Sequence, residues 1–341
     1  MIEGPSVTVI VPCRNEAGHL EEMLESLLSN DYPRERLEVV FVDGMSDDGT
    51  RELLERAARE HPFIRVLDNP RRTVPCAMNE GIRRTRGEVI VRLDAHSRYP
   101  RDYVSRCVRL LLSTGAACAG GRVLTMPNGE GPWARAVAAV TSHVVGVGDS
   151  RFRTSRRAGY VDTVPLGTFR REVFERVGLF DERLTRNQDN ELTARIRRAG
   201  YKIAFDPSIH LVYWNQKSLK GLVHQGFHTG KWNVYTLWLY PYTWKASRFV
   251  PAAFVLYLAV LALVVPEGRP ALTSAAAAPL ALYGALVASI AAARGSAGGG
   301  ALRVAATVIA YHVSYGVGTH LGVANLLTGR WRAQLGRPLR P

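Results

Sequence analysis

Two side chains that can bind a metal cation follow an apolar run of the sequence. Residues 87–93 (GEVIVRL) predict a strand, and Asp94 and His96 come after it two positions apart, so both can face the same way. A carboxylate and an imidazole in this arrangement can share one divalent cation. Such a cation could neutralise the charge that develops on a departing diphosphate. The alternative is that both are ordinary surface residues at a strand end.

A second polar loop, VDGMSDDGT, follows another apolar strand. It carries Asp43, Ser46, Asp47 and Asp48, and acids in this place can accept hydrogen bonds from a base or a ribose. Ser46 or Asp48 could instead cap the helix predicted from TRELLERAARE. That alternative accounts in part for Asp48 but leaves Asp43 unexplained.

Both loops belong to a repeating pattern of strand, loop and helix. The strands predicted are SVTVIVP, LEVVFV, FIRVL and GEVIVRL, and AGHLEEMLESLL, RELLERAAREH and VPCAMNEGIRRTR predict helices between them. This alternation predicts an α/β domain whose mostly parallel sheet is covered on both faces. The loops after Val11, Val42 and Leu93 then share the carboxyl edge of the sheet, where ligands gather.

The chain is basic, with a formal net charge of +14. This excess of positive charge is compatible with binding to nucleic acid, to an anionic membrane surface or to a phosphate-bearing substrate. We expect no nucleic acid, because there is no zinc-finger spacing or RNP-like motif and the arginines are scattered. The four cysteines show no CxxC spacing, which predicts reduced thiols in a cytosolic domain.

Charged residues become rare after residue 248. Three apolar runs, 249–265, 271–293 and 304–327, contain 17, 23 and 24 residues, near the ~20 that a membrane-spanning helix needs. We predict about three hydrophobic helices. The third run contains polar residues (His312, His320 and Asn325), so packing inside protein or re-entry stays open. Three crossings would also place the C-terminal arginines outside, against the positive-inside rule, which favours one run not spanning.

The segment 218–248 mixes Trp, Tyr, His and Lys before the first apolar run. Aromatic rings and cations are typical of a membrane interface, although a buried helix of the soluble part is the alternative. The predicted organisation is a cytosolic catalytic domain at 1–217, an interfacial segment at 218–248 and a membrane domain at 249–341.

The chain resembles the inverting family-two glycosyltransferases, which have the GT-A nucleotide-sugar-binding fold. The resemblance covers about residues 6–232 and lies in VIVPCRNE, VVFVDGMSDDGT, VPCAMNEGIRRTRGEVIVRLDAHS and VGLFDERLTRNQDNELTARIRRAGYKI, in the family's order. The DAHS variant and GVGDSRFRT are most similar to the succinoglycan-type glucosyltransferases of bacterial exopolysaccharide assembly.

The resemblance implies a nucleotide-sugar site at the predicted sheet edge. Pro12, Arg14 and Glu16 would line the nucleotide pocket, and Asp43 would bond the uracil ring. Arg72 would lie near the diphosphate, unless it is a solvated surface arginine.

The resemblance also implies a divalent metal cofactor, Mn²⁺ or Mg²⁺. Asp94 matches the first acid of the family's Asp-x-Asp motif, on the donor side of the site. The chain departs from this motif at the last position, where His96 replaces an aspartate. Because histidine suits Mn²⁺ better than Mg²⁺, the identity of the metal and direct ligation by His96 stay open.

Inversion at a sugar carbon requires a base near the attacking hydroxyl, and a carboxylate can serve. In NQDNELTARIRRAG the family's acid pair is reduced to Asp189, because Gln188 occupies the first position, and Asp189 is the implied base. The alternative is that Asp189 caps a helix while Glu191 pairs with Arg195 four residues on. We accept the pairing for Glu191.

Acceptor-side residues are suggested more weakly. Gly167, in VPLGTFRREVFERVGLFDE, would let backbone approach a sugar. HQGFHTGKW partly matches the Gln-x-x-Arg-Trp motif of processive synthases and nominates Gln225, Lys231 and Trp232, with His228 where arginine would be. A tryptophan that anchors the chain at the membrane is the alternative.

These predictions describe a multi-pass protein of the bacterial inner membrane with its catalytic domain in the cytoplasm. It would move a hexose, glucose by the narrower resemblance, from a UDP-sugar to a polyprenyl-diphosphate-linked saccharide, alongside other polysaccharide-assembly enzymes. One alternative is transfer to polyprenyl phosphate itself. Another is a non-catalytic scaffold or sugar-nucleotide sensor, favoured by the substituted positions Gln188 and His96.

Overall fold

The computed structural model describes residues 4–148, 150–267 and 270–335. The chain forms two compact units. The first contains the residues up to Leu124 together with Arg151–Tyr213, and the second contains Thr125–Ser150 and the chain from Trp214 onward. The boundary expected at residue 217 lies near the end of the first unit. No pattern in the sequence indicates that residues 125–150 belong to the second unit.

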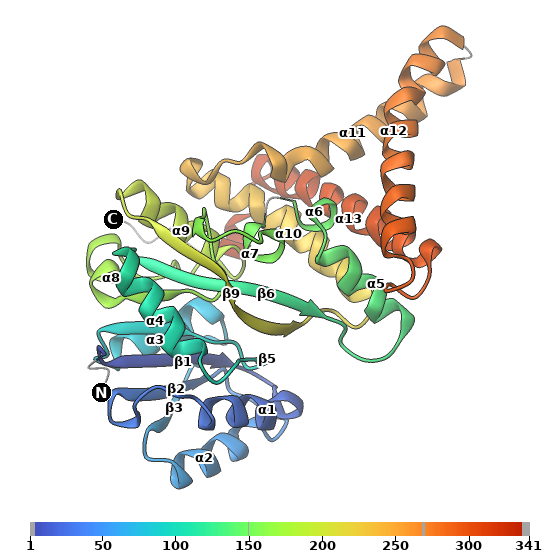
Figure 1. Cartoon of the computed structure of the whole chain (residues 1–341). Coiled ribbons are helices and arrows are strands. Elements are labelled where there is room, and N and C mark those ends of the chain that lie inside the picture. The colour runs from blue at the N-terminus through green and yellow to red at the C-terminus, as the bar shows by residue number, and fades with distance from the viewer. Residues whose placement is uncertain (1–3, 149, 268–269, 336–341) are drawn as a thin grey trace. The chain divides into compact units, whose positions relative to one another are not determined.

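In the described part of the chain, nine strands form one mixed sheet (Figure 1). The strands are β1 (Val7–Cys13), β2 (Leu37–Asp43), β3 (Ile64–Asp68), β4 (Val89–Arg92), β5 (Ser97–Arg98), β6 (Cys118–Met126), β7 (Gly159–Tyr160), β8 (Thr168–Arg170) and β9 (Ile203–Trp214). Their order is β3-β2-β1-β4-β8-β6-β9-β5, and β7 pairs with β9. The strands β1 to β4 are parallel, whereas β8 runs antiparallel to β4.

Helices connect these strands and continue beyond them (Figure 1). The helices are α1 (Ala17–Leu28), α2 (Thr50–Glu60), α3 (Val74–Arg83), α4 (Tyr103–Thr114), α5 (Pro132–Thr141), α6 (Val144–Val147), α7 (Arg151–Thr154), α8 (Arg171–Val177), α9 (Gln188–Arg198), α10 (Leu219–Leu239), α11 (Val250–Val264), α12 (Pro270–Arg294), α13 (Ala301–Leu327) and α14 (Arg332–Leu335).

Helices cover both faces of the parallel strands. Val9 of β1 belongs to a core shared with Leu20 and Met23 of α1, while its neighbour Ile10 belongs to a second core with Met78 of α3. Burial on both faces explains why these strands are continuous apolar runs. In the register of the sheet, Cys13 lies opposite Asp43, which lies opposite Asp68, so the carboxyl ends of β1, β2 and β3 form one edge.

In the second unit, α13 packs closely against α10. A methyl group at Gly230 would lie 2.0 Å from the carbonyl oxygen of Tyr315, and one at Gly318 would lie 1.9 Å from that of Phe227, so both glycines are required for this approach. Polar groups are paired across the two helices, because Asn325 donates to the Tyr235 hydroxyl at 2.9 Å.

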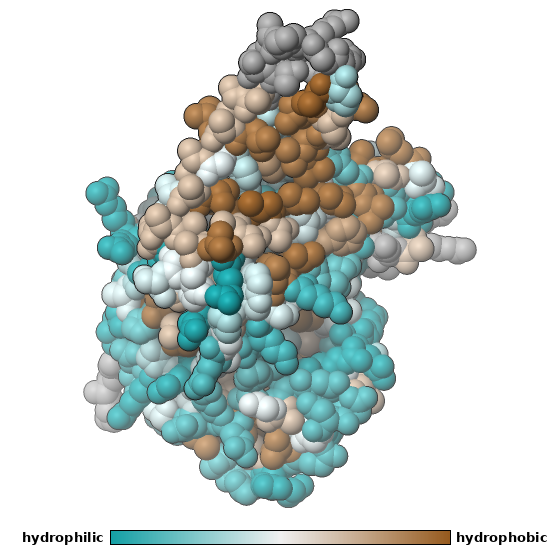
Figure 2. All heavy atoms as spheres, turned by 90° about the vertical axis from the view of Figure 1, so that its right-hand side faces the viewer, coloured by the Kyte–Doolittle hydropathy of each residue, from teal (hydrophilic) through white to brown (hydrophobic). Residues whose placement is uncertain are grey.

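Within the described residues, two helices are long and apolar enough to cross a membrane. Their most apolar windows are Ala246–Leu263 and Ala277–Arg294, in which 6% and 17% of residues are buried. Figure 2 shows apolar side chains gathered over one part of the surface, in the upper half of the view, whereas hydrophilic side chains dominate the lower half. These windows overlap the first two predicted runs.

The third predicted run, 304–327, lies in α13 and is not among the helices that pass this test. Its polar residues are engaged inside the second unit. His312 contacts the Tyr283 hydroxyl at 3.0 Å, and His320 contacts the carbonyl oxygen of Ala252 at 2.9 Å. Packing against protein, one of the options that the sequence left open, therefore describes this helix.

Candidate active site

A pocket opens at the carboxyl edge of the parallel strands in the first unit. Six of the residues predicted for the donor and metal site line it, namely Pro12, Arg14, Glu16, Arg72, Asp94 and His96. The rest of its wall is formed by Cys13, Gly44, Asn69, Thr73, Val74, Ala77 and Arg92. The structure therefore brings these predicted side chains together at one edge of the sheet, where the loops after β1 and β4 meet the start of α3.

Arg92 joins the two carboxylates on which the predicted chemistry depends. This last residue of β4 is only 5% exposed. Its guanidinium donates to Asp94 Oδ1 at 3.0 and 3.1 Å and to Asp189 Oδ1 at 2.5 Å. Burial acts to lower the pKa of Arg92, but the two carboxylates outweigh it and raise the pKa, so the cation persists. Asp94 and Asp189 are 95 positions apart in sequence, but both accept hydrogen bonds from the same buried guanidinium.

Asp189 lies in the first turn of α9, whose N-cap is Asn187 in the left-handed conformation (φ 63°). The alternative in which Asp189 itself caps the helix is therefore wrong. Burial raises the pKa of Asp189 to about 6, and the charge of Asp94 adds to the rise while Arg92 opposes it. A carboxylate that titrates near neutral pH can accept a proton and release it again, as a general base must.

His96 and Glu16 form a second pair at the pocket. His96 Nδ1 lies 2.9 Å from Glu16 Oε1, and the His96 ring meets the edge of Tyr213 with centroids 5.5 Å apart. Burial alone would lower the pKa of His96, but the hydrogen bond to Glu16 and the charge of Asp94 outweigh it, so this pKa is raised.

These contacts fit a metal site that is completed by substrate. A metal-bound histidine commonly donates its other ring N–H to a carboxylate, as His96 Nδ1 can donate to Glu16. Both hydrogen bonds from Arg92 go to Oδ1 of Asp94, which leaves Oδ2 for a cation. Over the residues that the structure covers, no cluster of three or more His, Cys, Asp or Glu side chains could hold a metal. Mg²⁺ and Mn²⁺ sites in nucleotide enzymes commonly rely on one or two protein ligands plus phosphate oxygens.

Asp43 is the predicted residue that fits its assigned role least directly. It ends β2 at the pocket edge but is 2% exposed and is not part of the pocket wall. Its Oδ1 accepts a hydrogen bond from the Ser46 hydroxyl at 2.5 Å, so its carboxylate already has a partner inside the loop. The neighbouring Gly44 forms the wall in its place.

The other acids of this loop tie it to the loop after β1. Asp48 accepts from the backbone of Thr50 at 3.0 Å and from that of Ala17 at 3.2 Å. Asn15 donates to Asp47 at 2.8 Å. The N-cap of α2 is Gly49, so neither Ser46 nor Asp48 is the capping residue, although Asp48 accepts from the backbone of Thr50, the first residue of the helix. These acids hold together the two loops that flank the pocket.

The start of α3 forms another part of the pocket wall. Arg72 adopts a left-handed conformation (φ 59°) directly before this helix, and Asn69, Thr73 and Val74 share the pocket wall with it. In the described chain the buried Thr73 hydroxyl has no hydrogen-bond partner. Helix N-termini with nearby donors favour anions such as phosphate.

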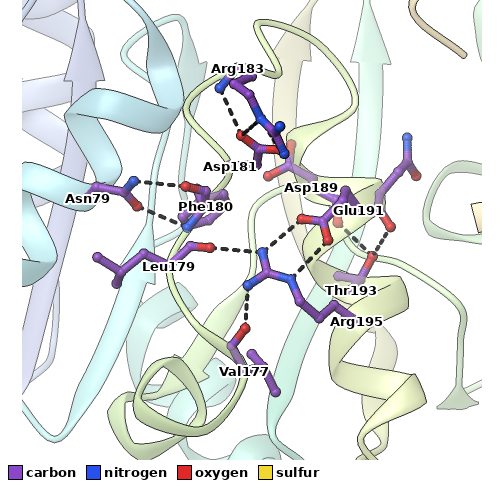
Figure 3. A network of polar contacts seen from close by, with 11 residues as sticks. Asn79, Val177, Leu179, Phe180, Asp181, Arg183, Asp189, Glu191, Thr193 and Arg195 are labelled. Atoms are coloured by element: carbon purple, nitrogen blue, oxygen red, sulfur yellow. Dashed lines mark hydrogen bonds and ion pairs between the residues drawn. The ribbon is translucent and has the colours of Figure 1, made fainter. Parts of the chain in front are cut away.

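Glu191 has the structural role expected of it. It is fully buried and forms a bidentate ion pair with Arg195. Arg195 Nε donates to Glu191 Oε1 at 2.9 Å, and Arg195 Nη2 donates to Glu191 Oε2 at 2.8 Å. Arg195 also donates to the carbonyl oxygens of Val177 and Leu179 (Figure 3). The pair therefore fixes the segment after α8 against the helix that carries Asp189.

The residues nominated for the acceptor divide between the two units. A methyl group at Gly167 would lie 2.4 Å from the Phe169 ring, so packing is the reason for glycine there, and its carbonyl oxygen accepts from the Arg92 backbone at 3.1 Å. Gln225, Lys231 and Trp232 lie in α10 of the second unit. Lys231 and Trp232 are 7% and 6% exposed, so in this structure Trp232 packs in a core instead of presenting a sugar platform.

Sequence reasoning missed Arg92 and Tyr213. The signal for Arg92 was present, because a charged residue within the apolar run VIVRL must find a partner if that strand is buried. Tyr213 had no local signal, since its contact with His96 depends on the pairing of β5 with β9, which brings Ser97 opposite Tyr213.

Comparison with known proteins points to one enzyme family. The model of glycosyl transferase family 2 matches residues 8–178. The succinoglycan biosynthesis protein ExoA of Rhizobium meliloti (strain 1021) is 34% identical over 228 residues, covering 66% of this chain and 68% of that protein. A dolichyl N-acetyl-alpha-D-glucosaminyl phosphate 3-beta-D-2,3-diacetamido-2,3-dideoxy-beta-D-glucuronosyltransferase of Methanococcus voltae is 23% identical over 279 residues, covering 77% and 87%.

Among solved structures, the chain is similar to the mannosyltransferase PcManGT of Pyrobaculum calidifontis, determined with GDP-Man and Mn²⁺. The TM-score is 0.57 at 26% identity, and the match covers 92% of this chain and 88% of that one. The predicted GT-A α/β fold with apolar C-terminal helices is confirmed, as is the prediction of a glycosyltransferase related to polysaccharide enzymes. The chain belongs to glycosyltransferase family 2.

Proposed function

We propose that this glycosyltransferase moves a hexose, with inversion, from a UDP-sugar to a saccharide carried on a polyprenyl diphosphate. The observation that carries the proposal is the bridge from Arg92 to Asp94 and Asp189. It sets a carboxylate of the donor pocket beside a second carboxylate with a pKa of about 6.

In this proposal the donor diphosphate lies between the start of α3 and Asp94. Arg72 and the Thr73 hydroxyl would contact its oxygens, and Asp94 with His96 would hold the divalent ion. That ion, when bound, neutralises charge on the leaving diphosphate. The His96 substitution favours Mn²⁺ over Mg²⁺.

Asp189 acts as the base. The acceptor hydroxyl oxygen attacks the anomeric carbon, the bond from that carbon to the diphosphate oxygen breaks, and the bonding pair leaves with the diphosphate. The hydroxyl proton passes to the Asp189 carboxylate. Arg92 keeps this carboxylate ionised near neutral pH and fixes its distance from Asp94.

Two observations support a lipid-linked acceptor at the bacterial inner membrane. Two described helices are apolar enough to cross a bilayer, which would hold the chain at the surface where a polyprenyl-linked sugar lies. The relative from M. voltae acts, by its name, on a dolichyl-linked sugar phosphate. The multi-pass arrangement and the cytoplasmic side of the catalytic domain belong to the same proposal.

Transfer to polyprenyl phosphate itself is the second candidate. It is favoured by likeness to an undecaprenyl-phosphate 4-deoxy-4-formamido-L-arabinose transferase of Pseudomonas syringae, 31% identical over 107 residues. A non-catalytic scaffold is disfavoured, because a scaffold needs neither Asp94 nor Asp189 on a shared cation.

The test uses the purified full chain with a panel of nucleotide sugars that includes UDP-glucose and GDP-mannose. Each is incubated with Mn²⁺ or Mg²⁺ and with either bacterial lipid extract or bare undecaprenyl phosphate, and products are identified by mass. A hexose added to a lipid-linked saccharide from a UDP-sugar supports the proposal. Product on bare undecaprenyl phosphate alone selects the second candidate, and a GDP-sugar donor rejects the uridine assignment.

A further inference from the structure

A second groove in the first unit shares no wall residue with the donor pocket. It is lined by residues of the segment 151–161, among them Arg151, Thr154, Ser155, Arg157 and Tyr160. We call it the 151–161 groove. It lies between α7 and β7, which is the part of the chain that contains four arginines in seven residues, RFRTSRR.

The groove carries uncompensated positive charge. Arg151 and Arg157 are exposed, and among the described residues neither forms an ion pair with an acid. The Ser155 hydroxyl fixes the turn between them, because it donates to the Arg157 carbonyl oxygen at 3.1 Å and accepts from the Arg157 backbone at 3.2 Å. A third cation, Lys202, lies 4.8 Å from the centre of the Tyr160 ring. Guanidinium groups beside hydroxyls match the oxygens of a phosphate.

The chain that leaves the groove contacts the helix that carries Asp189. Val161 donates to the carbonyl oxygen of Ile203 at 3.0 Å, which fixes β7 along β9. Two residues further on, the Thr163 hydroxyl lies 3.1 Å from that of Thr193, and Thr193 donates to the Asp189 carbonyl oxygen at 2.6 Å. A short stretch of chain therefore joins the groove to a contact with the first half of α9.

The same segment also reaches the metal side of the donor pocket. The Arg153 guanidinium lies 5.4 Å from the centre of the Tyr213 ring. The Tyr213 ring in turn lies 5.5 Å from that of His96. The segment that forms the groove thus lies near the surroundings of His96, and its continuation to Thr163 contacts the helix of Asp189. An acceptor must approach these two residues.

We propose that the 151–161 groove binds the diphosphate group of the acceptor. This inference rests on the proposed function. The proposed function places the donor diphosphate at Arg72, Thr73 and Asp94, which are not part of this groove. A separate cationic groove, in a stretch of chain that continues to a contact with α9, suits a second anionic substrate. Arg151 and Arg157 hold the acceptor by its phosphates, and the sugar hydroxyl extends toward Asp189.

Binding of geranyl diphosphate to the full chain in detergent tests the groove by itself. Isothermal titration is done in EDTA, so that a metal at Asp94 does not hold the probe. The double variant Arg151→Gln/Arg157→Gln should bind about tenfold more weakly or worse, because each lost contact is a charge-assisted hydrogen bond. The matched control is Arg156→Gln, since Arg156 is exposed in the same segment but does not line the groove.

Two results would overturn the proposal. One is equal affinity of the double variant and the wild type. The other is an equal loss in Arg156→Gln, which would mean diffuse charge without a site. A further arm adds vesicles of phosphatidylglycerol, and displacement of geranyl diphosphate by them would assign the groove to membrane headgroups instead.

Transfer kinetics separate this proposal from the proposed function. In the double variant the KM for lipid-linked acceptor should rise about tenfold, while hydrolysis of the nucleotide sugar without acceptor stays unchanged. Failure of the wild type to glycosylate any lipid acceptor would reject the proposed function, whereas the titration with geranyl diphosphate would still decide whether the groove binds a diphosphate.

Discussion

Replacing Arg92 by glutamine should move the pH dependence of transfer to higher pH. Arg92 is buried and donates to Asp189 at 2.5 Å, so its charge favours the ionised form of that carboxylate. In the variant, burial and the charge of Asp94 still raise the pKa of Asp189, but the opposing cation is gone. Because the base must be ionised to act, less of the enzyme is active at neutral pH.

The size of the shift follows from the contact that is lost. A hydrogen bond to a charged group contributes about 1.5–3 kcal/mol, and one pKa unit corresponds to about 1.4 kcal/mol. The pKa of Asp189, about 6 in the native chain, should therefore rise by about one to two units. At pH 7 the ionised fraction would fall from about nine-tenths to between about one-half and one-tenth.

The assay measures release of nucleoside diphosphate between pH 5 and 9 at saturating acceptor. The native chain should lose activity as the pH falls through about 6, since Asp189 then gains its proton. In Arg92→Gln this loss of activity on acidification should occur at about pH 7–8. In Arg92→Lys it should occur at a pH between those of the native chain and of Arg92→Gln. Arg98→Gln, at an exposed position of the next strand, serves as control, and circular dichroism checks that each variant folds.

An acid limb in Arg92→Gln at the native position, with only the rate reduced, would refute this reasoning. It would mean that Arg92 does not control ionisation of the base, or that the titrating group is not Asp189.

Three other perturbations test separate parts of the account. His96→Asp should retain transfer and shift the preference from Mn²⁺ toward Mg²⁺, because it restores two carboxylates; rates with each ion measure this, and an unchanged preference would remove His96 from the metal site. Arg195→Met should leave the buried Glu191 carboxylate unpaired at a cost of about 3 kcal/mol, which lowers the thermal midpoint by about 6–12 °C. The matched variant Arg176→Met, at an exposed position, should keep the native thermal midpoint. An equal decrease of the midpoint in this variant would argue against a specific contribution from the Glu191–Arg195 ion pair. After extraction of membranes with alkaline carbonate, the native chain should remain in the membrane pellet, because two helices can span the bilayer. Release of the chain into the supernatant would contradict a membrane-spanning arrangement.

Local patterns in the sequence predicted the first unit well. The strands β1 to β4 and the helices α1 to α3 follow from apolar runs and helical spacing, and parallel pairing then brings Arg14, Arg72 and Asp94 to one edge. Asp94 and His96 line one pocket because both follow the same strand. No long-range information was needed for this part.

The remaining features depend on contacts that leave no local pattern. The charged Arg92 within an apolar strand indicates that it needs a partner, but that partner, Asp189, lies on a helix whose position the sequence does not fix. Gly167 was assigned to sugar approach, whereas the ring of Phe169 is what excludes a side chain there. Residues 125–150 resemble the rest of the soluble part in composition, and α5 nevertheless packs with α12 and α13.

Asp189→Asn tests the central claim most directly, because it removes the base while keeping the size of the side chain. Transfer to lipid-linked acceptor and affinity for the nucleotide sugar are measured on the same preparation. The account predicts a loss of about 10²–10⁴ in the rate of transfer, with donor affinity within about twofold of the native value. Transfer at more than about a tenth of the native rate would contradict a general base at this position.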